Sequence, residues 1–398
     1  MPATSRRGVR AAPLALALLA ALSCAPKIGA DTRAAAQGIP ARLGDRAFWR
    51  LVTELSEEGG VFRSDNFVSN EVAFQHVIPE LARRAPAGGV YLGVGPDQNF
   101  SYVVALRPKL AFIIDIRRQN MLQHLLFKAL IEPSSDRADF VAHLFSRRRP
   151  RALTPAASAG ASAEALFAAF EDVPPDSVLF HRNLAAVRRR LVEEHHFPLT
   201  REDLGTIEYI YRAFFEGGPE LTYTIGTGGA QRRWRRMPSY AQLIAETDGE
   251  GVQRSYLASE AHFRTLRELQ RNNLVVPLVG DFAGEKTIRA VGRWLAERGA
   301  KVTAFYTSNV EQYLFRQGDD WRLFFDNVAA LPVDSASVFI RAVFDYSYDP
   351  YTLGSMARSE TMLCPIAPLL AAVSDGRVQS YYDIVELSRA AVPGPVPP

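Results

Sequence analysis

Two glycines and one acidic residue stand at the ends of apolar runs, in an arrangement that suits a nucleotide-type ligand. The segment 88–120 reads GGVYLGVGPDQNFSYVVALRPKLAFIIDIRRQN, with Gly93 and Gly95 after one apolar run and Asp115 at the end of the next. Glycine lets the backbone turn sharply and lets a ligand approach it closely. A carboxylate about 20 residues further along can accept hydrogen bonds from the hydroxyls of a ribose. The spacing therefore predicts a cradle for a ribose-containing cofactor.

The glycine pattern differs from that of a dinucleotide site. In the fingerprint G-x-G-x-x-G the third glycine allows a helix to pack closely on a strand, and Gln98 stands at that position here. Pro96 also makes the turn bulkier. Both departures weigh against a nucleotide-cofactor oxidoreductase, which ranks third among the possible functions, after a methyltransferase-like enzyme and a binding protein. We expect Asp97 to contact the ligand, and Asn99, also a candidate cofactor-binding residue, to cap the helix that begins near Phe100.

A sheet is needed to bring such residues together. Near-continuous apolar runs, typical of strands buried on both faces, alternate with segments of helical periodicity. These runs are VYL, AFIID, NLVVPLVGD, KVTAFYTSN and SASVFIRAVF. The order predicts an α/β protein with a doubly wound, mostly parallel sheet, in which ligands bind beyond the carboxyl ends of the strands. Upstream, we expect a helix from about Glu71 to Arg84, capped by Ser69 or Asn70.

The motifs resemble those of class I S-adenosylmethionine-dependent methyltransferases, which have a Rossmann-like fold. VYLGVGPDQNF resembles their first motif and FIIDI their second. The wording of YLGVGPDQNF, FIIDIRRQN, VGDFAGEKTIR and TSNVEQYLF is also similar to an uncharacterised bacterial family with a methyltransferase-like fold. The resemblance implies S-adenosylmethionine as the cofactor, with Gly93, Gly95 and Asp97 around its methionine part and Asp115 at its ribose.

Three further motifs extend the resemblance along the chain. It implies that Asp281 and Phe282, in LVGDF, flank the adenine. It also implies that Asn66, in SDNFVSNE, lies over the methionine end of the cofactor. The substrate-side candidates are Ser308 and Asn309, in FYTSN, and Glu311 and Tyr313, just after it. Glu311 and Tyr313 are also the candidates for a base.

The chain divides into five parts by composition. The third part is rich in Ala, Arg, Phe, Leu and Glu at helical periodicity, which predicts a largely helical insertion where a minimal methyltransferase has a single helix. The parts are a leader (1–30), the first half of the α/β domain (31–132), the helical insertion (133–270), the second half (271–390) and a disordered proline-rich tail (391–398).

The first residues have the composition of an export signal. Three arginines precede an apolar run over residues 11–22, shorter than the about 20 residues of a membrane-spanning helix. Ser23-Cys24 resembles a lipoprotein cleavage site, at which Cys24 would be acylated, but the leucine usual three places earlier is Ala21. Cleavage near Ala30 and a cytoplasmic protein are the alternatives. We expect an exported, periplasmic or lipid-anchored protein.

Other chemistry-bearing residues fit structural roles better. A net charge of +3 and the basic runs SRRRPR and QRRWRRMP give no strong nucleic-acid signal, because such runs are usually solvated or paired with carboxylates. Alternatively, one run lies at the pocket mouth and recognises an anionic substrate. His195 and His196 are adjacent, so their side chains diverge on a helix and no metal site is predicted. Cys364 is expected to be buried. No Walker loop, Ser–His–Asp arrangement or His-Glu-x-x-His motif is found in the sequence.

Two functions therefore compete. The first is an S-adenosylmethionine-dependent methyltransferase of unknown acceptor, whose reaction mainly requires positioning and desolvation of the two partners. The second is an exported or lipid-anchored binding protein that keeps the methyltransferase-like fold without turnover, because S-adenosylmethionine is made and used in the cytoplasm. Both predict a small-molecule ligand, and neither fixes an oligomeric state.

Overall fold

Six strands form one sheet whose carboxyl edge carries the residues singled out in the sequence. The computed structural model describes residues 38–223, 237–345 and 358–391, and within them the strand order is β3-β2-β1-β4-β5-β6. All neighbouring strands are parallel except the pair β5 and β6. The strands are β1 (Val90–Gly93), β2 (Leu110–Asp115), β3 (Val275–Val279), β4 (Val302–Ser308), β5 (Val338–Asp345) and β6 (Arg358–Pro365). The prediction of an α/β protein with a mostly parallel sheet is confirmed.

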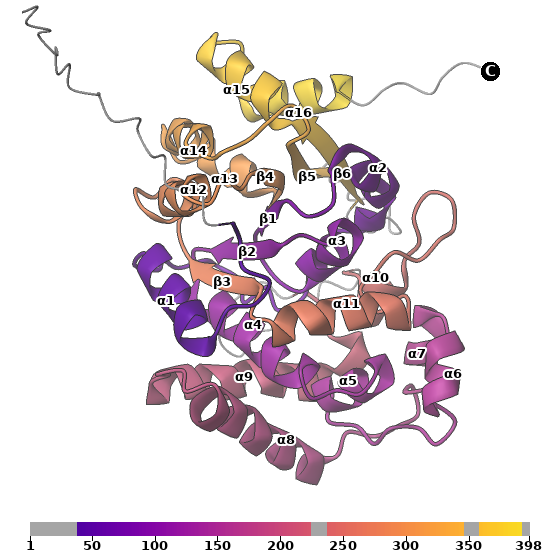
Figure 1. Ribbon diagram of the computed structural model, residues 1–398. Helices are drawn as coiled ribbons and strands as arrows, with labels where there is room; N and C mark the ends of the chain where they lie inside the picture. The colour runs from indigo at the N-terminus through magenta and orange to yellow at the C-terminus, as the bar shows by residue number, and fades with distance from the viewer. Residues whose placement is uncertain (1–37, 224–236, 346–357, 392–398) are drawn as a thin grey trace, which may run out of the picture. The chain divides into compact units, whose positions relative to one another are not determined.

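Helices cover both faces of the sheet, as Figure 1 shows. Successive side chains of a strand point to opposite faces, and β4 illustrates this. Phe305 packs against Phe324 on one face, whereas Tyr306 contacts Tyr102 on the other, with ring centroids 6.1 Å and 5.1 Å apart. Phe324 lies in α14 (Asp320–Ala329) and Tyr102 in α3 (Gln98–Leu106). Strands covered in this way must be apolar on both faces, which is why β1 to β4 read as near-continuous apolar runs.

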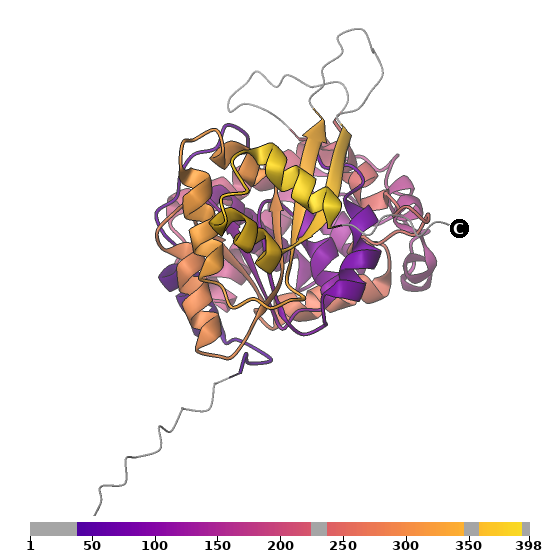
Figure 2. The same cartoon turned by 90° about the horizontal axis from the view of Figure 1, so that it is seen from above.

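The strand β6 was not predicted. Its sequence RSETMLCP opens with four polar residues, so it does not read as an apolar run, and it pairs antiparallel with β5 at the edge of the sheet, from Val338 opposite Pro365 onward. Cys364 is buried there, as expected. Figure 2 shows β5 and β6 side by side, with the yellow helices α15 (Ile366–Ser374) and α16 (Tyr381–Ala390) next to them.

The helix predicted over Glu71–Arg84 is shorter than expected. Glu71 and Val72 lie outside any helix, and Ala73 has a left-handed conformation with φ of 60°. Helix formation begins only after this residue. Ser69 does accept a hydrogen bond from the backbone of Glu71, but within a turn. The other elements of the first half are α1 (Asp45–Leu55), the 3-10 helix η1 (Phe74–Val77), α2 (Ile78–Arg84), α3 and α4 (Arg118–Ile131).

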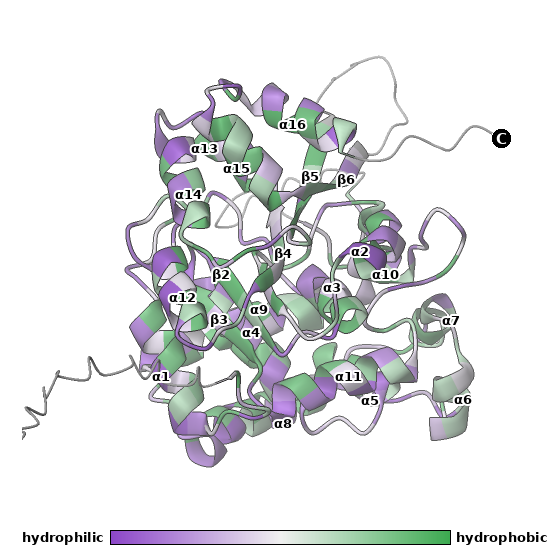
Figure 3. Ribbon diagram, turned by 45° about the horizontal axis from the view of Figure 1, so that its top comes forward, coloured by the Kyte–Doolittle hydropathy of each residue, from purple (hydrophilic) through white to green (hydrophobic). Residues whose placement is uncertain are grey.

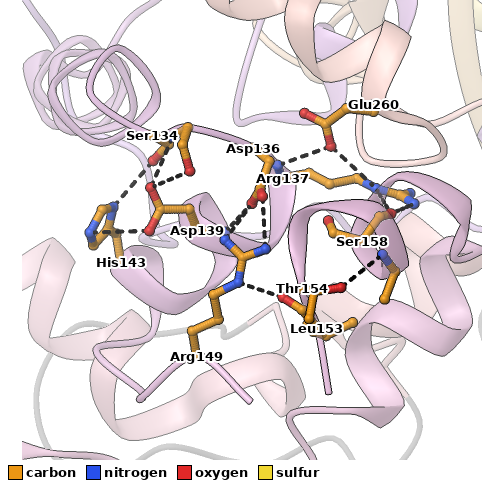
Figure 4. A network of polar contacts seen from close by, with 12 residues as sticks. Ser134, Asp136, Arg137, Asp139, His143, Arg149, Leu153, Thr154, Ser158 and Glu260 are labelled. Atoms are coloured by element: carbon orange, nitrogen blue, oxygen red, sulfur yellow. Dashed lines mark hydrogen bonds and ion pairs between the residues drawn. The ribbon is translucent and has the colours of Figure 1, made fainter. Parts of the chain in front are cut away.

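The chain between α4 and β3 consists mainly of helices. Arg137 is fully buried among them and donates to the carbonyl oxygens of Leu257 (2.6 Å) and Ser158 (3.2 Å), while Asp136 forms two hydrogen bonds with Arg149 (Figure 4). These contacts tie together segments that are far apart in sequence. The helices are α5 (Arg137–Leu144), α6 (Pro155–Gly160), α7 (Ala163–Ala168), α8 (Ser177–Arg189), the π-helix η2 (Arg190–Glu194), α9 (Arg201–Gly217), the 3-10 helix η3 (Gly218–Glu220), α10 (Tyr240–Ala245) and α11 (Glu260–Arg271).

The hydropathy of the ribbon follows this layering. Figure 3 shows hydrophobic strands at the centre and helices in which hydrophobic and hydrophilic residues alternate, as in α12 (Thr287–Ala296). The remaining helix, α13 (Val310–Leu314), follows β4 directly. Among the described residues, no helix is long and apolar enough to cross a membrane. The predicted leader with Cys24 and the predicted tail beyond residue 391 lie outside the described residues.

A cluster of charged side chains fixes α1 and η2 against α4. The two ring nitrogens of His195 lie 2.8 Å from Glu132 Oε2 and 3.0 Å from Asp45 Oδ1, and Lys128 Nζ lies 2.6 Å from Glu132 Oε1. Burial would lower the pKa of His195, but the hydrogen bond and charge of Glu132 outweigh it and raise that pKa. The imidazolium form donates to both carboxylates. His195 is therefore a structural ion-pair partner, whereas its neighbour His196 is exposed.

Replacing His195 by Gln should remove a pH-dependent part of the stability. A raised folded-state pKa gives stability that is complete below the unfolded pKa of 6.5 and is lost as the pH rises through the folded pKa. Urea denaturation across this range should show a falling unfolding free energy for the wild type and a flatter profile for His195→Gln. His196→Gln is the matched control. Equal slopes for the wild type and His195→Gln would contradict the assignment.

Candidate functional site

A cavity of about 340 Å³ opens at the carboxyl edge of the sheet. Its wall includes residues that follow β1, β2, β3 and β4, together with the segment between α1 and η1. Volumes of roughly 300–1,000 Å³ are usual for small-molecule sites. Eight of the residues singled out in the sequence line it: Asn66, Gly95, Asp115, Asp281, Phe282, Ser308, Asn309 and Tyr313.

The glycine turn after β1 is held from behind by buried polar side chains. Gly95 has φ of 78°, a conformation that favours glycine, and its carbonyl oxygen accepts from His124 Nε2 (2.9 Å) and Asn99 Nδ2 (3.3 Å). A Cβ on Gly93 would lie 1.9 Å from Asn99 Oδ1, so the first glycine makes room for this asparagine. Gly93 and Asn99 therefore shape the turn from outside the cavity wall. Burial lowers the pKa of His124 to about 4, so its ring is neutral.

Asp97 does not reach the cavity. It is the residue before α3, without a side-chain cap, and its carboxylate is buried on the other side of the turn, where Tyr256 donates to it at 2.8 Å. Burial raises the pKa of Asp97 to about 7 against the opposing effect of Tyr256. The expectation that Asp97 contacts the ligand is therefore corrected: Asp97 makes a buried contact with Tyr256, which lies between α10 and α11. Asn99 likewise lies inside α3, which begins at Gln98, instead of capping a helix that starts near Phe100.

Asp115 lies at the end of β2 and pairs with Arg117. The guanidinium group of Arg117 donates from Nε to Oδ1 (2.9 Å) and from Nη2 to Oδ2 (2.8 Å), and both side chains are buried. Arg117 Nη1 also donates to the carbonyl oxygens of Ser64 (3.0 Å) and Asp65 (2.6 Å). The residue expected to bind the ribose is therefore an ion-pair partner on the cavity wall.

The loop after β3 is held by a carboxylate from the segment after α1. Glu57 accepts from the backbone nitrogens of Asp281 (3.0 Å) and Lys286 (3.2 Å), and Asp281 Oδ1 accepts from Ala283 (2.9 Å). Phe282 stacks on Phe324, with centroids 5.3 Å apart and planes at 14°. Phe282 is thus largely committed to the core, while Asp281 is partly exposed at the cavity.

Two non-glycine residues of the wall have left-handed backbones. Asn66 has φ of 51° and Ser308 has φ of 52°. Such conformations cost free energy and are retained where surrounding contacts impose them, often at ligand sites. Asn309 and Tyr313 complete this side of the cavity. Glu311 does not: it is buried and bonded to Arg341 Nε at 2.9 Å and 2.8 Å, so it is corrected from a candidate base to an ion-pair partner.

Sequence reasoning missed several polar residues of the wall, among them Arg117, Tyr306 and Glu71. Arg117 was seen only as part of the motif FIIDIRRQN, Tyr306 only as part of a strand, and Glu71 as the first residue of a helix. Glu71 is the most buried of the wall's carboxyls, 1% exposed, and accepts from Tyr306 at 2.7 Å. One signal was available: Glu71 belongs to SDNFVSNE, the segment already associated with the cofactor through Asn66.

A second group of residues has the composition of a hydrolytic triad, close to Arg137 in Figure 4. Ser134 Oγ lies 3.2 Å from His143 Nδ1, and His143 Nε2 lies 3.8 Å from Asp139. The Ser134 hydroxyl, however, donates to the carbonyl oxygen of Leu130 at 2.7 Å, and the side chain is fully buried. A nucleophile must reach its substrate, so these positions favour a structural role for Ser134.

The remaining alternatives from the sequence also receive structural roles. In the described part of the chain, no group of three or more metal-binding side chains is found. Of the basic run SRRRPR, Arg147 donates to Val173, Arg148 pairs with Asp176 and Arg149 with Asp136. The second basic run falls mostly within 224–236, outside the described residues.

Fold and cavity together define an α/β protein with a ligand-sized site at the carboxyl edge of a mostly parallel sheet. Residues 66–154 and 155–361 match a family model described as a domain of unknown function (DUF7790), and the chain belongs to this family. The match begins at Asn66 and extends past β5 into β6, so it includes the glycine turn, Asp115, Asp281 and Ser308. No curated protein matches the chain.

Removing the guanidinium group of Arg117 should cost about 3–5 kcal/mol of unfolding free energy, because Asp115 is left buried without its charge partner. Arg117→Met keeps much of the side-chain volume, and chemical denaturation measures the loss. Arg389→Met is the control, since Arg389 pairs with Glu360 on the surface and should cost about 0–1 kcal/mol. Similar losses for both variants would contradict the role given to Arg117.

Replacing Asp97 by Asn should flatten the acid side of the stability profile. The folded pKa of about 7 exceeds the unfolded value of 3.8, so stability present below the unfolded pKa is lost as the pH rises toward 7. Asparagine keeps an acceptor for Tyr256 and has no charge to bury. Glu246→Gln is the comparison, because burial raises the pKa of Glu246 to about 7 as well. An Asp97→Asn profile as steep as that of the wild type would show the assignment to be wrong.

Proposed function

We propose that the protein binds S-adenosylmethionine in the cavity at the sheet edge and is a methyltransferase-like protein. One observation carries the proposal: residues from separate motifs, assigned to one cofactor by resemblance, line one cavity. Gly95, Asp115 and Asp281 follow three adjacent strands, and Asn66 and Ser308 lie across from them. A shared cavity is what a single ligand contacted by all these motifs requires.

The order of the strands supports a Rossmann-like, doubly wound arrangement of the class I methyltransferase type. The chain runs outward from β1 to β2 and β3, then returns to β4 beside β1 and continues to β5. In open α/β sheets of this kind, ligands bind in the crevice where the strand order reverses. That crevice lies between β1 and β4, and both the glycine turn and Ser308 border it.

In this proposal the cofactor is held by backbone and carboxyl groups. The turn at Gly95 accommodates the methionine part, because the side facing Asn66 has no Cβ in the way. Asp281 accepts a hydrogen bond from the adenine amino group. Asp115 and Arg117 form the ribose side together. The backbone nitrogen and the guanidinium group of Arg117 occupy three of the about four acceptor positions of the carboxylate, which leaves one, on Oδ2, for a ribose hydroxyl.

A non-catalytic binding protein with the same fold is the second candidate, and a specific observation favours it. Both oxygens of the Asp115 carboxylate already accept from Arg117, so the ribose interaction is weaker than that of a free carboxylate. In this alternative the protein is exported or lipid-anchored through its leader, and the ligand is held without turnover.

Calorimetric titration of the full chain with S-adenosylmethionine tests the proposal. We expect saturable binding that Asp281→Asn weakens about tenfold, as expected for the loss of one hydrogen bond to a charged group. Asparagine preserves the contact with Ala283, so the loop should keep its shape. Asp375→Asn, on an exposed acid far along the chain, should bind like the wild type. Absence of heat with the folded wild type would refute the proposal.

A further inference from the structure

Glu71 occupies the crevice between the ends of β1 and β4. It comes from the segment between α1 and η1 and lies on the cavity wall, yet its side chain is almost wholly withdrawn from solvent. Its Oε1 accepts from the Tyr306 hydroxyl at 2.7 Å and from the Ser308 hydroxyl. Its Oε2 accepts from Gln98 Nε2 at 2.8 Å. The carboxyl group therefore bridges the two loops at which the strand order reverses.

The hydrogen bonds around Glu71 determine its protonation state and the acceptor position that it has left for a ligand. Burial raises the pKa of Glu71, and the bonds from Ser308, Tyr306 and Gln98 oppose that rise without cancelling it. All three partners donate, so they favour the carboxylate form. A carboxylate has about four acceptor positions, and three are used here. The remaining position suits a donor group of a ligand in the cavity.

The backbone conformation of Ser308 helps to hold the Glu71 carboxylate in one position. Its left-handed conformation, uncommon for serine, directs the hydroxyl to Glu71 at the point where β4 ends. Tyr306 is fixed in turn by its contact with Tyr102. Two donors from one strand end thus hold a single carboxyl oxygen, which is the kind of support that keeps a reacting group in place.

We propose that Glu71 receives the proton of the acceptor during methyl transfer, and that the acceptor is a protic nitrogen or oxygen nucleophile. The proposal rests on the proposed function of the cavity. It assigns to this site a substrate class that carries an N–H or O–H group, in contrast to a carbon nucleophile or a preformed thiolate.

The step balances without a further reactant. A lone pair of the nitrogen or oxygen forms a bond to the methyl carbon, the carbon–sulfur bond breaks, and its electron pair stays on sulfur. The positive charge that develops on the nucleophile is released as a proton, which Glu71 accepts. Burial raises the pKa of Glu71 above that of an ordinary carboxyl, which makes its carboxylate a stronger proton acceptor.

Two analogues test the position of Glu71 without knowledge of the acceptor. S-adenosylhomocysteine has no group at the position of the methyl, whereas sinefungin carries a primary amine there. If Glu71 faces that position, sinefungin should bind the wild type about tenfold or more tighter than S-adenosylhomocysteine, as expected for a hydrogen-bonded charge pair. The advantage should grow as the pH rises and Glu71 ionises.

Glu71→Gln is the decisive variant. Gln98 Oε1 has no hydrogen-bond partner in the described structure, so the Gln98 amide can turn and accept from the new amide. We expect the sinefungin advantage to fall to about twofold or less, with S-adenosylhomocysteine binding unchanged. Glu246→Gln is the control, because Glu246 is a half-buried carboxyl with a raised pKa that does not line the cavity, and this variant should keep the advantage.

Tyr306→Phe gives a second reading if Glu71→Gln does not fold. It removes one donor and keeps the ring contact with Tyr102, so the pH at which the sinefungin advantage appears should move upward. A merely structural role would leave this midpoint where it is. Equal binding of both analogues to the wild type would overturn the role of Glu71 while leaving the proposed function intact. Failure of both analogues to bind would overturn the proposed function itself.

Discussion

The carboxyl edge of the sheet depends on the ion pair and hydrogen bonds of the Arg117 guanidinium group. This group neutralises Asp115 at the end of β2 and, through Nη1, holds the backbone of Ser64 and Asp65. That backbone leads directly into Asn66 and on to Glu71, which cover the cavity. A buried arginine with all these partners stabilises one geometry, because losing any partner leaves a charge or carbonyl unsatisfied in a low-dielectric environment.

The other loops at the carboxyl edge are also held by hydrogen bonds from side chains. Asn99 and His124 hold the glycine turn, Glu57 holds the loop after β3, and Glu71 joins the loops after β1 and β4. Each loop is thus held by hydrogen bonds from side chains that lie outside it. Preorganisation of this kind reduces the ordering cost of binding. It also explains why several residues expected to touch the ligand instead support those that line the cavity.

The sequence predicted the sheet well because parallel strands buried on both faces leave long apolar runs, and five of the six described strands were found in this way. It missed the edge strand β6, because four polar residues open it and no long apolar run marks it. It also began the helix after Ser69 too early, because nothing in the sequence signals the left-handed turn at Ala73. For the site, residues at strand ends were predictable from their position alone. The direction of a side chain such as Asp97 or Glu311 was not, since it depends on the distant partners Tyr256 and Arg341.

The central claim is that the cavity at the carboxyl edge of the sheet takes an adenosyl ligand. A crystal structure of the protein grown with S-adenosylhomocysteine tests it most directly. The account predicts the adenine beside Asp281, the ribose at Asp115 and the amino-acid end above the turn at Gly95. Density for the ligand at another surface, or an empty cavity at a saturating ligand concentration, would contradict it.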